Sequence, residues 1–551
     1  MNSRTECIEK LTAGSFDVLI IGGGITGAGI ALDAASRGLK TALIEKNDFA
    51  WGTSSRSTKL IHGGLRYLKQ LEFGLVKEVG SERAILHKLA PHLVIAEKML
   101  LPLKEGRGFG TLLTSFGLKL YDWLAGVKEA DQRKMLTRQQ TLKHEPLLKT
   151  EGIKGGGLYA EYRTDDARLT LEIIKTARMY HAEAINYVEA KTFLYTDGKV
   201  SGVQATDQVT KKSFSIQANQ VVNAAGPWVD QLREKDKSKT GKTLHLTKGV
   251  HIVVPREKLP VRQAIYFDVP DGRMIFAIPR GRTTYIGTTD TDYTHNIDEV
   301  ITSTEDATYL IDAVNDSFPS VHLSMNDIES SWAGLRPLIH EDGKSASELS
   351  RKDEIFVAPS GLISIAGGKL TGYRKMAERV VDMVAERSGR DDLIDCFTDK
   401  ISLSENNFKD ADAVHDFKQK LIEQLSPFGL AGYAGYLVDT YGRQAEEIFR
   451  QLTYFNDADA STRLARAELK YGVEHEMIIS ILDFFIRRTG MLFFDMPRLQ
   501  QVKNVVLNDM KTLLGRDATQ FQVERNKLDK EIAAAQVTLR QAQDDREVMS
   551  C

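Results

Sequence analysis

The chain has 551 residues, of which 42% are hydrophobic and 27% charged, and its formal net charge is −2 at pH 7. This length exceeds what one hydrophobic core usually serves, so we expect two or three domains. The near-neutral charge gives no indication of a nucleic-acid partner. The three cysteines, Cys7, Cys396 and Cys551, are scattered and predict neither a disulfide framework nor a zinc site, which is typical of a reducing cytoplasm.

The N-terminal residues 1–15 are polar and lack the apolar centre of a signal peptide. The chain contains no run of about 18 apolar residues, so we expect no membrane-spanning helix. Attachment to a membrane surface stays open.

The first folded elements predict a βαβ unit. An apolar run at 16–21 is typical of a buried parallel strand, and a glycine cluster and a helical stretch at 27–38 follow it. A second apolar run at 41–44 leads into Glu45.

The glycine cluster at 22–27, Gly-Gly-Gly-Ile-Thr-Gly, fits the dinucleotide fingerprint G-x-G-x-x-G, and Glu45 follows at the expected distance of about 20 residues. Such glycines allow a tight turn, a close approach to a pyrophosphate and close packing of helix on sheet. The helix N-terminus offers N–H groups to the phosphates, and Glu45 accepts hydrogen bonds from ribose hydroxyls. The fingerprint alone does not choose between FAD and NAD.

Further runs predict short strands at 185–222, 251–254, 274–278, 284–287 and 362–366. A helix that contains 376–384 follows the last of them, and the pattern after about residue 395 is helical. The tail from Val523 is strongly charged, which predicts a solvated helix.

Two distant segments favour FAD over NAD. Residues 221–228 form an apolar strand that ends in small residues, which permits close approach of the backbone to a cofactor. Residues 365–374 form a second junction of strand, glycines and helix, whose helix N-terminus would stabilise negative charge on a reduced flavin. For each segment taken alone, an ordinary connection between a strand and a helix is the alternative.

The segment at 53–68 reads Thr-Ser-Ser-Arg-Ser-Thr-Lys-Leu-Ile-His-Gly-Gly-Leu-Arg-Tyr-Leu. Together with Ile-Gly-Gly-Gly-Ile-Thr-Gly-Ala-Gly-Ile at 21–30, it closely resembles the FAD-dependent glycerol-3-phosphate dehydrogenases, which belong to the D-amino-acid-oxidase-like flavoproteins. The resemblance extends over about 16–495 and includes the segments 248–255, 333–338, 367–371, 471–473 and 487–489. Two positions depart from the family pattern: Arg56 stands where we expect a small residue, and Gly372 where we expect a hydroxyl residue.

The resemblance implies an α/β fold with three parts. A discontinuous Rossmann-type FAD-binding domain takes 15–90, 145–235 and 350–395, and an inserted antiparallel-sheet substrate domain takes 91–144 and 236–349. An all-α C-terminal domain takes 396–551.

The implied cofactor is FAD, and no metal is expected. The implied cofactor-binding residues lie in the glycine motifs and beside them: Gly22, Gly23, Gly24, Thr26, Gly27, Glu45, Lys46, Thr53, Ser54, Ser55, Lys59, Leu60, Gly63, Gly64, Leu65, Ala224, Ala225, Gly226, Trp228, Gly334, Gly367, Gly368, Lys369, Leu370 and Thr371.

The substrate of this family carries a phosphate dianion, which the planar guanidinium of arginine suits best. The resemblance implies Arg66 and Arg336 as the leading phosphate ligands, with Lys369 beside them. Arg351 and Arg374 are weaker candidates. For any single arginine, the alternative is an ion pair at the protein surface.

Oxidation requires a hydride to leave C2 while the C2 hydroxyl loses its proton, and a base with a pKa near neutrality suits the proton transfer. His62 is the first candidate for the base, and His251 and Lys248 are the others. Tyr67 is placed to hold a substrate hydroxyl. A histidine that only packs against the flavin is the alternative for His62.

The implied reaction is oxidation of sn-glycerol 3-phosphate to dihydroxyacetone phosphate, with electrons passed to a membrane quinone. The protein would then sit in the cytoplasm, in peripheral contact with the inner face of the cell membrane, as a monomer or a homodimer. The aromatic-rich segment at 109–124 is the candidate for that contact, and packing on the protein's own core is its alternative.

Three other functions stay open at this point. One is an oxygen-using glycerol-3-phosphate oxidase, and another is an amino-acid or amine oxidase of the same fold. The third is a flavoprotein without catalytic activity, or one that modifies tRNA, although the chain shows no basic tract for nucleic acid.

Overall fold

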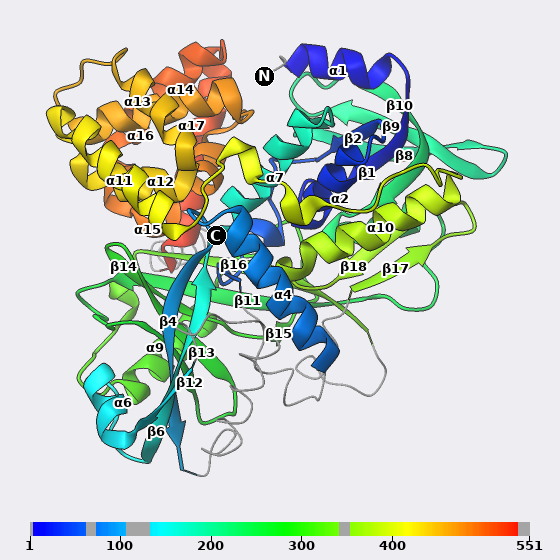
Figure 1. Ribbon diagram of the computed structural model, residues 1–551. Helices are drawn as coiled ribbons and strands as arrows, with labels where there is room; N and C mark the ends of the chain where they lie inside the picture. The colour runs from blue at the N-terminus through cyan, green and yellow to red at the C-terminus, as the bar shows by residue number, and fades with distance from the viewer. Residues whose placement is uncertain (1–3, 62–72, 106–132, 341–352, 538–551) are drawn as a thin grey trace, which may run out of the picture.

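The computed structural model describes residues 4–61, 73–105, 133–340 and 353–537, which form two sheets and a helical domain (Figure 1). The first sheet has the order β17-β18-β10-β1-β2-β7, with β9 and β8 added beside β10. Its strands are β1 (Ser15–Ile21), β2 (Thr41–Ile44), β7 (Glu183–Ile185), β8 (Val188–Thr196), β9 (Lys199–Asp207), β10 (Ser213–Asn223), β17 (Asp353–Val357) and β18 (Ile363–Gly367).

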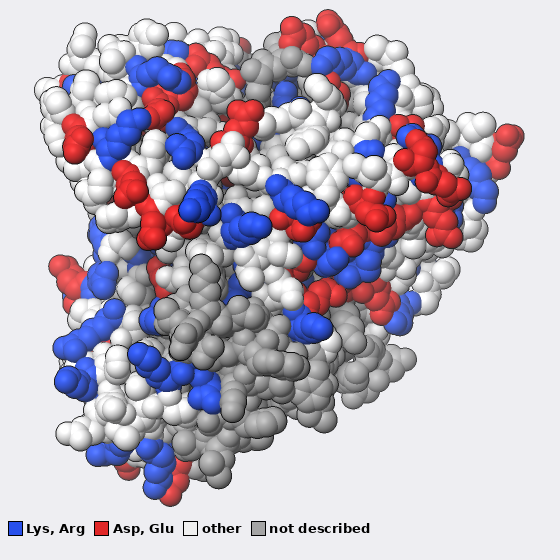
Figure 2. Space-filling model, viewed as in Figure 1, with Lys and Arg blue, Asp and Glu red and all other residues white. Residues whose placement is uncertain are grey.

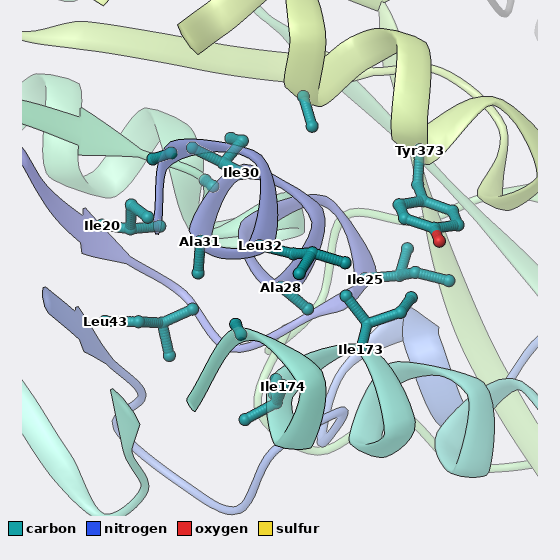
Figure 3. Packing of buried hydrophobic residues seen from close by; sticks show 14 of the residues in the cluster. Ile20, Ile25, Ala28, Ile30, Ala31, Leu32, Leu43, Ile173, Ile174 and Tyr373 are labelled. Carbon is teal, nitrogen blue, oxygen red and sulfur yellow. The ribbon is translucent and has the colours of Figure 1, made fainter. Parts of the chain in front are cut away.

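Apolar side chains cover both faces of β1, as expected of a buried parallel strand. Ile20 of β1 and Leu43 of β2 belong to an apolar cluster that residues of the helices α2 (Ile25–Ser36), α7 (Asp166–Met179) and α10 (Tyr373–Arg387) complete (Figure 3). On the other face, the meander β8–β9–β10 and helix α1 (Arg4–Thr12) bury alternate residues of the same strands. The predicted βαβ unit is confirmed, because β1 pairs in parallel with β2 across α2.

The second sheet has the order β15-β11-β14-β13-β12-β4-β6-β3, with β16 paired to β11 and β5 paired to β6. Most of its pairs are antiparallel, and β12 pairs with β4 in parallel. Its strands are β3 (Leu60–Ile61), β4 (Ile95–Lys104), β5 (Lys134–Thr137), β6 (Ile153–Arg163), β11 (Leu244–Pro255), β12 (Ala264–Asp268), β13 (Met274–Arg280), β14 (Thr283–Gly287), β15 (Thr291–Asp292) and β16 (Ser330–Ile339).

The sequence-based boundary between the first two domains differs from the sheets at two strands. Strand β3 lies inside the 15–90 range that we assigned to the FAD-binding domain, yet it pairs with β6 in the second sheet. Strand β6 lies inside the 145–235 range that we assigned to the FAD-binding domain, yet it pairs with β4 in the second sheet over ten positions. The reason is that β6 leads directly into α7, so the chain passes from one sheet to the other at about Thr164.

The remaining helices serve the sheets and connect them. Helix α9 (Thr304–Ser317) packs on one face of the second sheet. The other elements of this part are α4 (Phe73–Leu89), α6 (Arg138–His144), α8 (Val229–Lys235), and the short helices η1 (Thr53–Ser55), η3 (Gly226–Trp228), η4 (Met325–Asp327), η5 (Leu370–Gly372) and η6 (Thr398–Lys400).

The C-terminal domain is helical, as predicted. It contains η7 (Leu403–Glu405), α11 (Ala411–Leu425), η8 (Ser426–Phe428), η9 (Ala431–Tyr433), α12 (Ala434–Tyr441), η10 (Gly442–Gln444), α13 (Ala445–Leu452), α14 (Ala460–His475), the π-helix η11 (Asp483–Arg488), α15 (Met491–Phe494), α16 (Met496–Leu513) and α17 (Ala518–Ala535).

The prediction that the charged tail is a solvated helix is wrong for α17. Leu528, Ile532 and Ala535 are buried, and their spacing places them on one face of the helix. That face packs on β16, where the Ser331 hydroxyl donates to the Ala535 carbonyl at 2.9 Å. Lys527, Asp529 and Lys530 are exposed, whereas Glu524 is buried and accepts from the Ser480 hydroxyl at 2.7 Å. Composition alone therefore concealed the buried face of this helix.

On the face of the molecule seen in Figure 2, basic and acidic side chains are intermingled over the helical domain and the first sheet. This distribution agrees with the net charge of −2.

Candidate active site

The carboxyl ends of four parallel strands meet at one edge of the first sheet. Strand β1 pairs in parallel with β10 on one side and with β2 on the other, and β10 pairs in parallel with β18. The segments that leave these ends are therefore brought together, and ligands of open α/β sheets bind at this edge. The four segments, at 22–27, 45–56, 224–228 and 367–371, are those in which the sequence placed most of the cofactor residues.

The glycine loop at 22–27 has the tight geometry that the fingerprint predicts. Gly22 has a φ of +119°, and a Cβ atom there would lie 2.5 Å from the Ala224 carbonyl oxygen. A Cβ atom at Gly27 would collide with the Gly22 carbonyl oxygen. Helix α2 begins at this loop with Gly24 as its N-cap, and this residue has no side chain to cap the helix. This is the arrangement of a helix N-terminus that binds phosphate.

Two side chains from the next segment bind the glycine loop directly. The Glu45 carboxylate accepts hydrogen bonds from the backbone N–H of Gly23 at 2.7 Å and of Asn47 at 2.8 Å. Burial raises the pKa of Glu45, although both hydrogen bonds act to lower it. The Ser54 hydroxyl accepts from the Ile25 N–H at 2.9 Å. A carboxylate that can accept from ribose hydroxyls and backbone N–H groups that can donate to a pyrophosphate therefore lie side by side.

Lys46 and Trp228 both bind Asp298, which belongs to the loop before α9. The Lys46 ammonium lies 2.8 Å from the Asp298 carboxylate and 4.5 Å from the centre of the Trp228 ring. The Trp228 indole N–H donates to the same carboxylate at 2.9 Å, and Trp51 packs on Trp228 with ring centres 5.5 Å apart. These contacts connect the nucleotide edge of the first sheet with the loop before α9.

The second sheet presents one face toward this edge. On β11 and β16, Gly249 pairs with Gly334 and His251 pairs with Trp332, so their side-chain positions share a face. A Cβ atom at Gly334 would lie 2.6 Å from the Arg56 carbonyl oxygen, and the Thr53 hydroxyl donates to the Leu335 carbonyl at 2.7 Å. The β16 strand therefore lies directly against η1 of the cofactor segment.

Arg336 lies on this same face, above Gly249, whose lack of a side chain leaves room for the guanidinium. The guanidinium donates to the Thr289 carbonyl at 3.1 Å, the Asp290 carboxylate at 3.2 Å and the Thr288 hydroxyl at 2.9 Å. About a fifth of the side chain is exposed, 21% by area. The cation is thus oriented by its neighbours and still accessible to an anion.

His251 is buried beside Arg336. Its Nε2 lies 3.0 Å from the Thr58 hydroxyl, and its ring stacks on Trp332. Its buried Nδ1 has no hydrogen-bond partner among the described residues. Burial, and then the charges of Arg336 and Lys59, lower the pKa of His251 well below 6.5, so the imidazole is neutral.

Lys248 does not lie with His251, so the geometry does not support its predicted catalytic role. His251 follows Lys248 by three positions on β11, so their side chains leave opposite faces of the strand. Lys248 shares its face with Val250 and Ile252, which pack in the core beneath α9. Its ammonium lies 2.5 Å from the Asp306 carboxylate at the start of that helix.

Arg374 is also paired elsewhere, so the geometry does not support its predicted role as a substrate ligand. Its guanidinium donates to both carboxylate oxygens of Glu82, at 2.9 Å and 2.6 Å, and the pair is buried. This contact fixes α4 against α10.

The ammonium of Lys59 is likewise paired within the fold, and the contact of this residue with the cofactor stays a prediction. Its buried ammonium lies 2.5 Å from the Asp166 carboxylate, which also accepts from the Ser57 N–H and hydroxyl. Asp166 therefore fixes the strand of the second sheet that begins with Leu60.

The fourth segment, 367–371, starts at the end of β18 and lies at the same edge of the first sheet. Gly367 and Gly368 end the strand with φ of +80°, and the short helix η5 leads into α10. Lys369 precedes η5 and is partly buried, and Thr371 is buried. Gly372 is the N-cap of α10, which explains why no hydroxyl residue is needed for the helix to begin there.

Several predicted site residues lie outside the described residues: His62, Gly63, Gly64, Leu65, Arg66, Tyr67 and Arg351. The candidate membrane segment at 109–124 lies outside them too. Sequence reasoning missed Thr58, Trp332 and Asp166, since each acts through a contact with a residue far along the chain. Among the helices that the structure describes, none has the length and apolarity to cross a membrane.

Comparison with known proteins places this geometry in a family. Residues 17–374 match the family described as FAD dependent oxidoreductase, and residues 396–521 match the C-terminal domain of alpha-glycerophosphate oxidase. The chain is 49% identical to the aerobic glycerol-3-phosphate dehydrogenase of Bacillus subtilis (strain 168), over 98% of each chain. It is 48% identical to that of Staphylococcus haemolyticus (strain JCSC1435), over 96% of each chain.

The chain belongs to the FAD-dependent glycerol-3-phosphate dehydrogenases. A crystal structure of the glycerol-3-phosphate dehydrogenase from Bacillus halodurans complexed with FAD is 45% identical and superposes with a TM-score of 0.83, with 97% of each chain covered. The L-alpha-glycerophosphate oxidase of Mycoplasma pneumoniae shares the fold, at 20% identity and a TM-score of 0.54, over 67% of this chain and 95% of that one.

The residues present fit the FAD of this dehydrogenase family. The glycine loop, the start of α2 with glycine at its N-cap, and Glu45 form a cradle for an adenosine diphosphate group. The segments 224–228 and 367–371 lie at the same sheet edge, where backbone can approach the rest of the cofactor. The predicted fold class and the predicted cofactor are therefore confirmed.

Proposed function

We propose that the protein oxidises sn-glycerol 3-phosphate to dihydroxyacetone phosphate with FAD and passes the electrons to a membrane quinone. The observation that carries this proposal is the position of Arg336. Its guanidinium lies on the sheet face that meets the cofactor segment at η1, and it is partly exposed. A fixed, accessible arginine beside a flavin site suits a phosphoester substrate.

The protein's side chains would bind and orient the substrate, and bound FAD supplies the acceptor of the hydride. Arg336 would take two phosphate oxygens through its planar fork. Lys369, Arg66 and Arg351 are proposed to share the charge of the dianion, and Tyr67 to hold a substrate hydroxyl. This cationic set distinguishes a phosphoester from an amino acid, which offers one carboxylate and an amine.

Proton removal from the C2 hydroxyl requires a base in its unprotonated form. His62 remains the first candidate, on the strength of its motif. His251 is the second candidate, because its imidazole is unprotonated and its Nδ1 has no hydrogen-bond partner within the described part of the chain. Its lowered pKa makes it a weaker base than a histidine that titrates near neutrality. Its contact with Thr58 orients the ring.

The proposal includes peripheral contact with the membrane, because a quinone dissolves in the bilayer. The aromatic-rich segment at 109–124 is the proposed contact. Flotation with liposomes tests it: changing Phe116 and Trp123 to polar residues should reduce the bound fraction. Equal flotation of the variant and the parent would discard this segment.

Anaerobic titration of the FAD-loaded protein tests the activity. We expect sn-glycerol 3-phosphate to bleach the flavin absorbance, and glycine and D-alanine to leave it unchanged. A soluble quinone analogue should then restore the flavin absorbance faster than air does. Light scattering of the same sample distinguishes a monomer from a homodimer. Flavin that stays oxidised with glycerol 3-phosphate, or that reoxidises fastest in oxygen, would contradict the proposal.

A further inference from the structure

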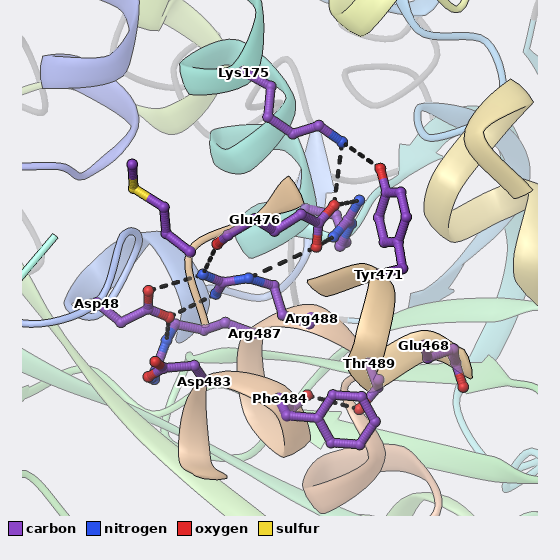
Figure 4. Close-up of polar contacts among 12 residues, drawn as sticks. Asp48, Lys175, Glu468, Tyr471, Glu476, Asp483, Phe484, Arg487, Arg488 and Thr489 are labelled. Atoms are coloured by element: carbon purple, nitrogen blue, oxygen red, sulfur yellow. Dashed lines mark hydrogen bonds and ion pairs between the residues drawn. The ribbon is translucent and has the colours of Figure 1, made fainter. Parts of the chain in front are cut away.

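A buried cluster of charged residues joins the helical domain to the first sheet (Figure 4). Its centre is Asp48, which lies three residues after Glu45. The Arg488 guanidinium donates to both Asp48 oxygens, at 2.6 Å and 2.9 Å, and Arg487 donates to the same carboxylate at 2.5 Å. Both arginines belong to η11 of the helical domain.

The cluster continues on both sides of the two arginines. Arg487 also donates to Asp483 at 2.7 Å, and Asp483 accepts from the Tyr187 hydroxyl of the first-sheet region at 2.7 Å. Arg488 also donates to the Glu476 carbonyl at 2.7 Å. The Glu476 carboxylate takes two hydrogen bonds from Arg168 of α7, at 2.8 Å and 2.9 Å.

Burial makes these contacts decisive for the position of Asp48. The side chains of Asp48, Arg487 and Arg488 are at most 3% exposed. Burial alone would raise the pKa of Asp48, but Arg488 and Arg487 outweigh it and keep the pKa at about 2. Moving Asp48 away from either arginine would leave a buried charge without that partner, which strongly destabilises a folded protein. The arginines therefore fix the position of Asp48.

The backbone around Asp48 is the backbone that holds the glycine loop. Glu45 accepts from the Gly23 N–H at 2.7 Å, and the Ala50 N–H donates to the Gly23 carbonyl at 2.9 Å. Asp48 lies between these two contacts. A shift of Asp48 therefore moves both of the hydrogen bonds that fix Gly23, at the place where the cofactor's pyrophosphate and ribose bind.

We propose that Arg487 and Arg488 are positioning residues for FAD, so that the docked helical domain is a working part of the cofactor site. They act through Asp48, which orders the 45–50 segment against the glycine loop. FAD affinity then depends on docking, and by linkage FAD binding strengthens docking. This inference rests on the FAD site alone and is independent of which substrate is oxidised.

The variant Arg488→Lys tests the proposal, because lysine keeps the charge but loses the two-pronged contact. The matched control is Arg498→Lys, since Arg498 forms a buried pair with Glu468 entirely inside the helical domain, at 3.0 Å. We expect Arg488→Lys to weaken FAD binding to the apoprotein at least tenfold, measured by fluorescence titration, and Arg498→Lys to change it less than twofold. Both variants should lower the melting temperature. Equal FAD affinities in the two variants would overturn the proposal.

A measurement on the unchanged protein covers the case in which Arg488→Lys does not fold. We expect hydrogen exchange at the backbone amides of η11 to be slower in the FAD-loaded protein than in the apoprotein. The amides of α11 should exchange at equal rates, because this helix lies in the same domain and supplies none of the polar partners of the Asp48 carboxylate within the described residues, which are Asn186, Arg487 and Arg488. Exchange in η11 that does not respond to FAD would overturn the proposal.

Discussion

His251 stacks on Trp332, with ring centres 4.8 Å apart and ring planes inclined by 13°. The stack closes the imidazole off from water, and Arg336 adds a nearby positive charge. Both effects favour the neutral ring and lower the pKa of His251, with burial as the larger cause.

We therefore predict that His251 does not take up a proton near pH 6.5, where a free imidazole titrates. NMR spectra of ¹⁵N-histidine-labelled protein should show its ring signals unchanged from pH 8 to about pH 6. The variant His251→Gln identifies the signals. A midpoint near the ordinary value would contradict the neutral state. Because the folded pKa is the lower one, this residue's contribution to stability is present above about pH 6.5 and decreases as the pH falls.

Replacing Arg336 by alanine should raise the Michaelis constant for glycerol 3-phosphate and leave FAD bound. Hydrogen bonds to a charged partner contribute about 1.5–3 kcal/mol, so we expect an increase of roughly 10- to 100-fold. The control is Arg282→Ala, since Arg282 forms an exposed pair with Glu329 on the same sheet. Unchanged steady-state kinetics in Arg336→Ala would remove Arg336 from the phosphate site.

Arg374→Ala should behave in the opposite way. Removal of one partner from a buried ion pair costs about 3–5 kcal/mol, so we expect a marked fall in melting temperature. The Michaelis constant should stay within about twofold of the parent value, because the Arg374 guanidinium is bound to Glu82. A large rise in the Michaelis constant of a folded Arg374→Ala protein would return this residue to the substrate site.

Gly27→Ala should abolish FAD binding, because a methyl group at Gly27 collides with the Gly22 carbonyl oxygen and forces the loop open. Gly435→Ala in α12 is the control, since a Cβ atom at Gly435 meets no atom within 4 Å. Alanine there should stabilise the helix by about 0.5–1 kcal/mol. Ultrafiltration followed by flavin absorbance measures the bound FAD, and full retention in Gly27→Ala would contradict the assigned role of the loop.

The Asp48 cluster predicts how the protein unfolds in acid. The pKa of Asp48 is depressed from 3.8 to about 2, so its contribution to stability is complete above about pH 4 and disappears as the pH falls through 2. Asp48→Asn should lower the stability at pH 7. The variant should then lose less stability than the parent between pH 4 and 2. Thermal melts across this range measure both, with Asp412→Asn at an exposed position of α11 as the control. Parallel curves for parent and Asp48→Asn would contradict the prediction.

The local pattern of the sequence predicted the nucleotide edge well, because its signals are short-range. The strand, the glycines, the helix and Glu45 all lie within 30 residues, and close packing at Gly22 and Gly27 requires glycine whatever the rest of the chain does. The face of Lys248 was also predictable: it is three residues from His251 on one strand, and strand periodicity alone separates them.

The other differences come from long-range contacts. Arg374 meets Glu82 across 292 positions and Arg488 meets Asp48 across 440, and no pattern along one sequence pairs such residues. The burial of α17 depends on the strand β16 that its apolar face covers. These contacts determine whether a charged side chain can bind a ligand or is held in a buried ion pair. Composition and motifs do not distinguish these two roles.

Three of the four tryptophans of the chain, Trp51, Trp228 and Trp332, lie around the site, two of them in contact beside the cofactor segment and the third under His251. The intrinsic emission of the protein is therefore concentrated where a flavin would absorb it by energy transfer. Cofactor loading and substrate arrival can accordingly be followed in solution by ultraviolet excitation, without attaching a dye.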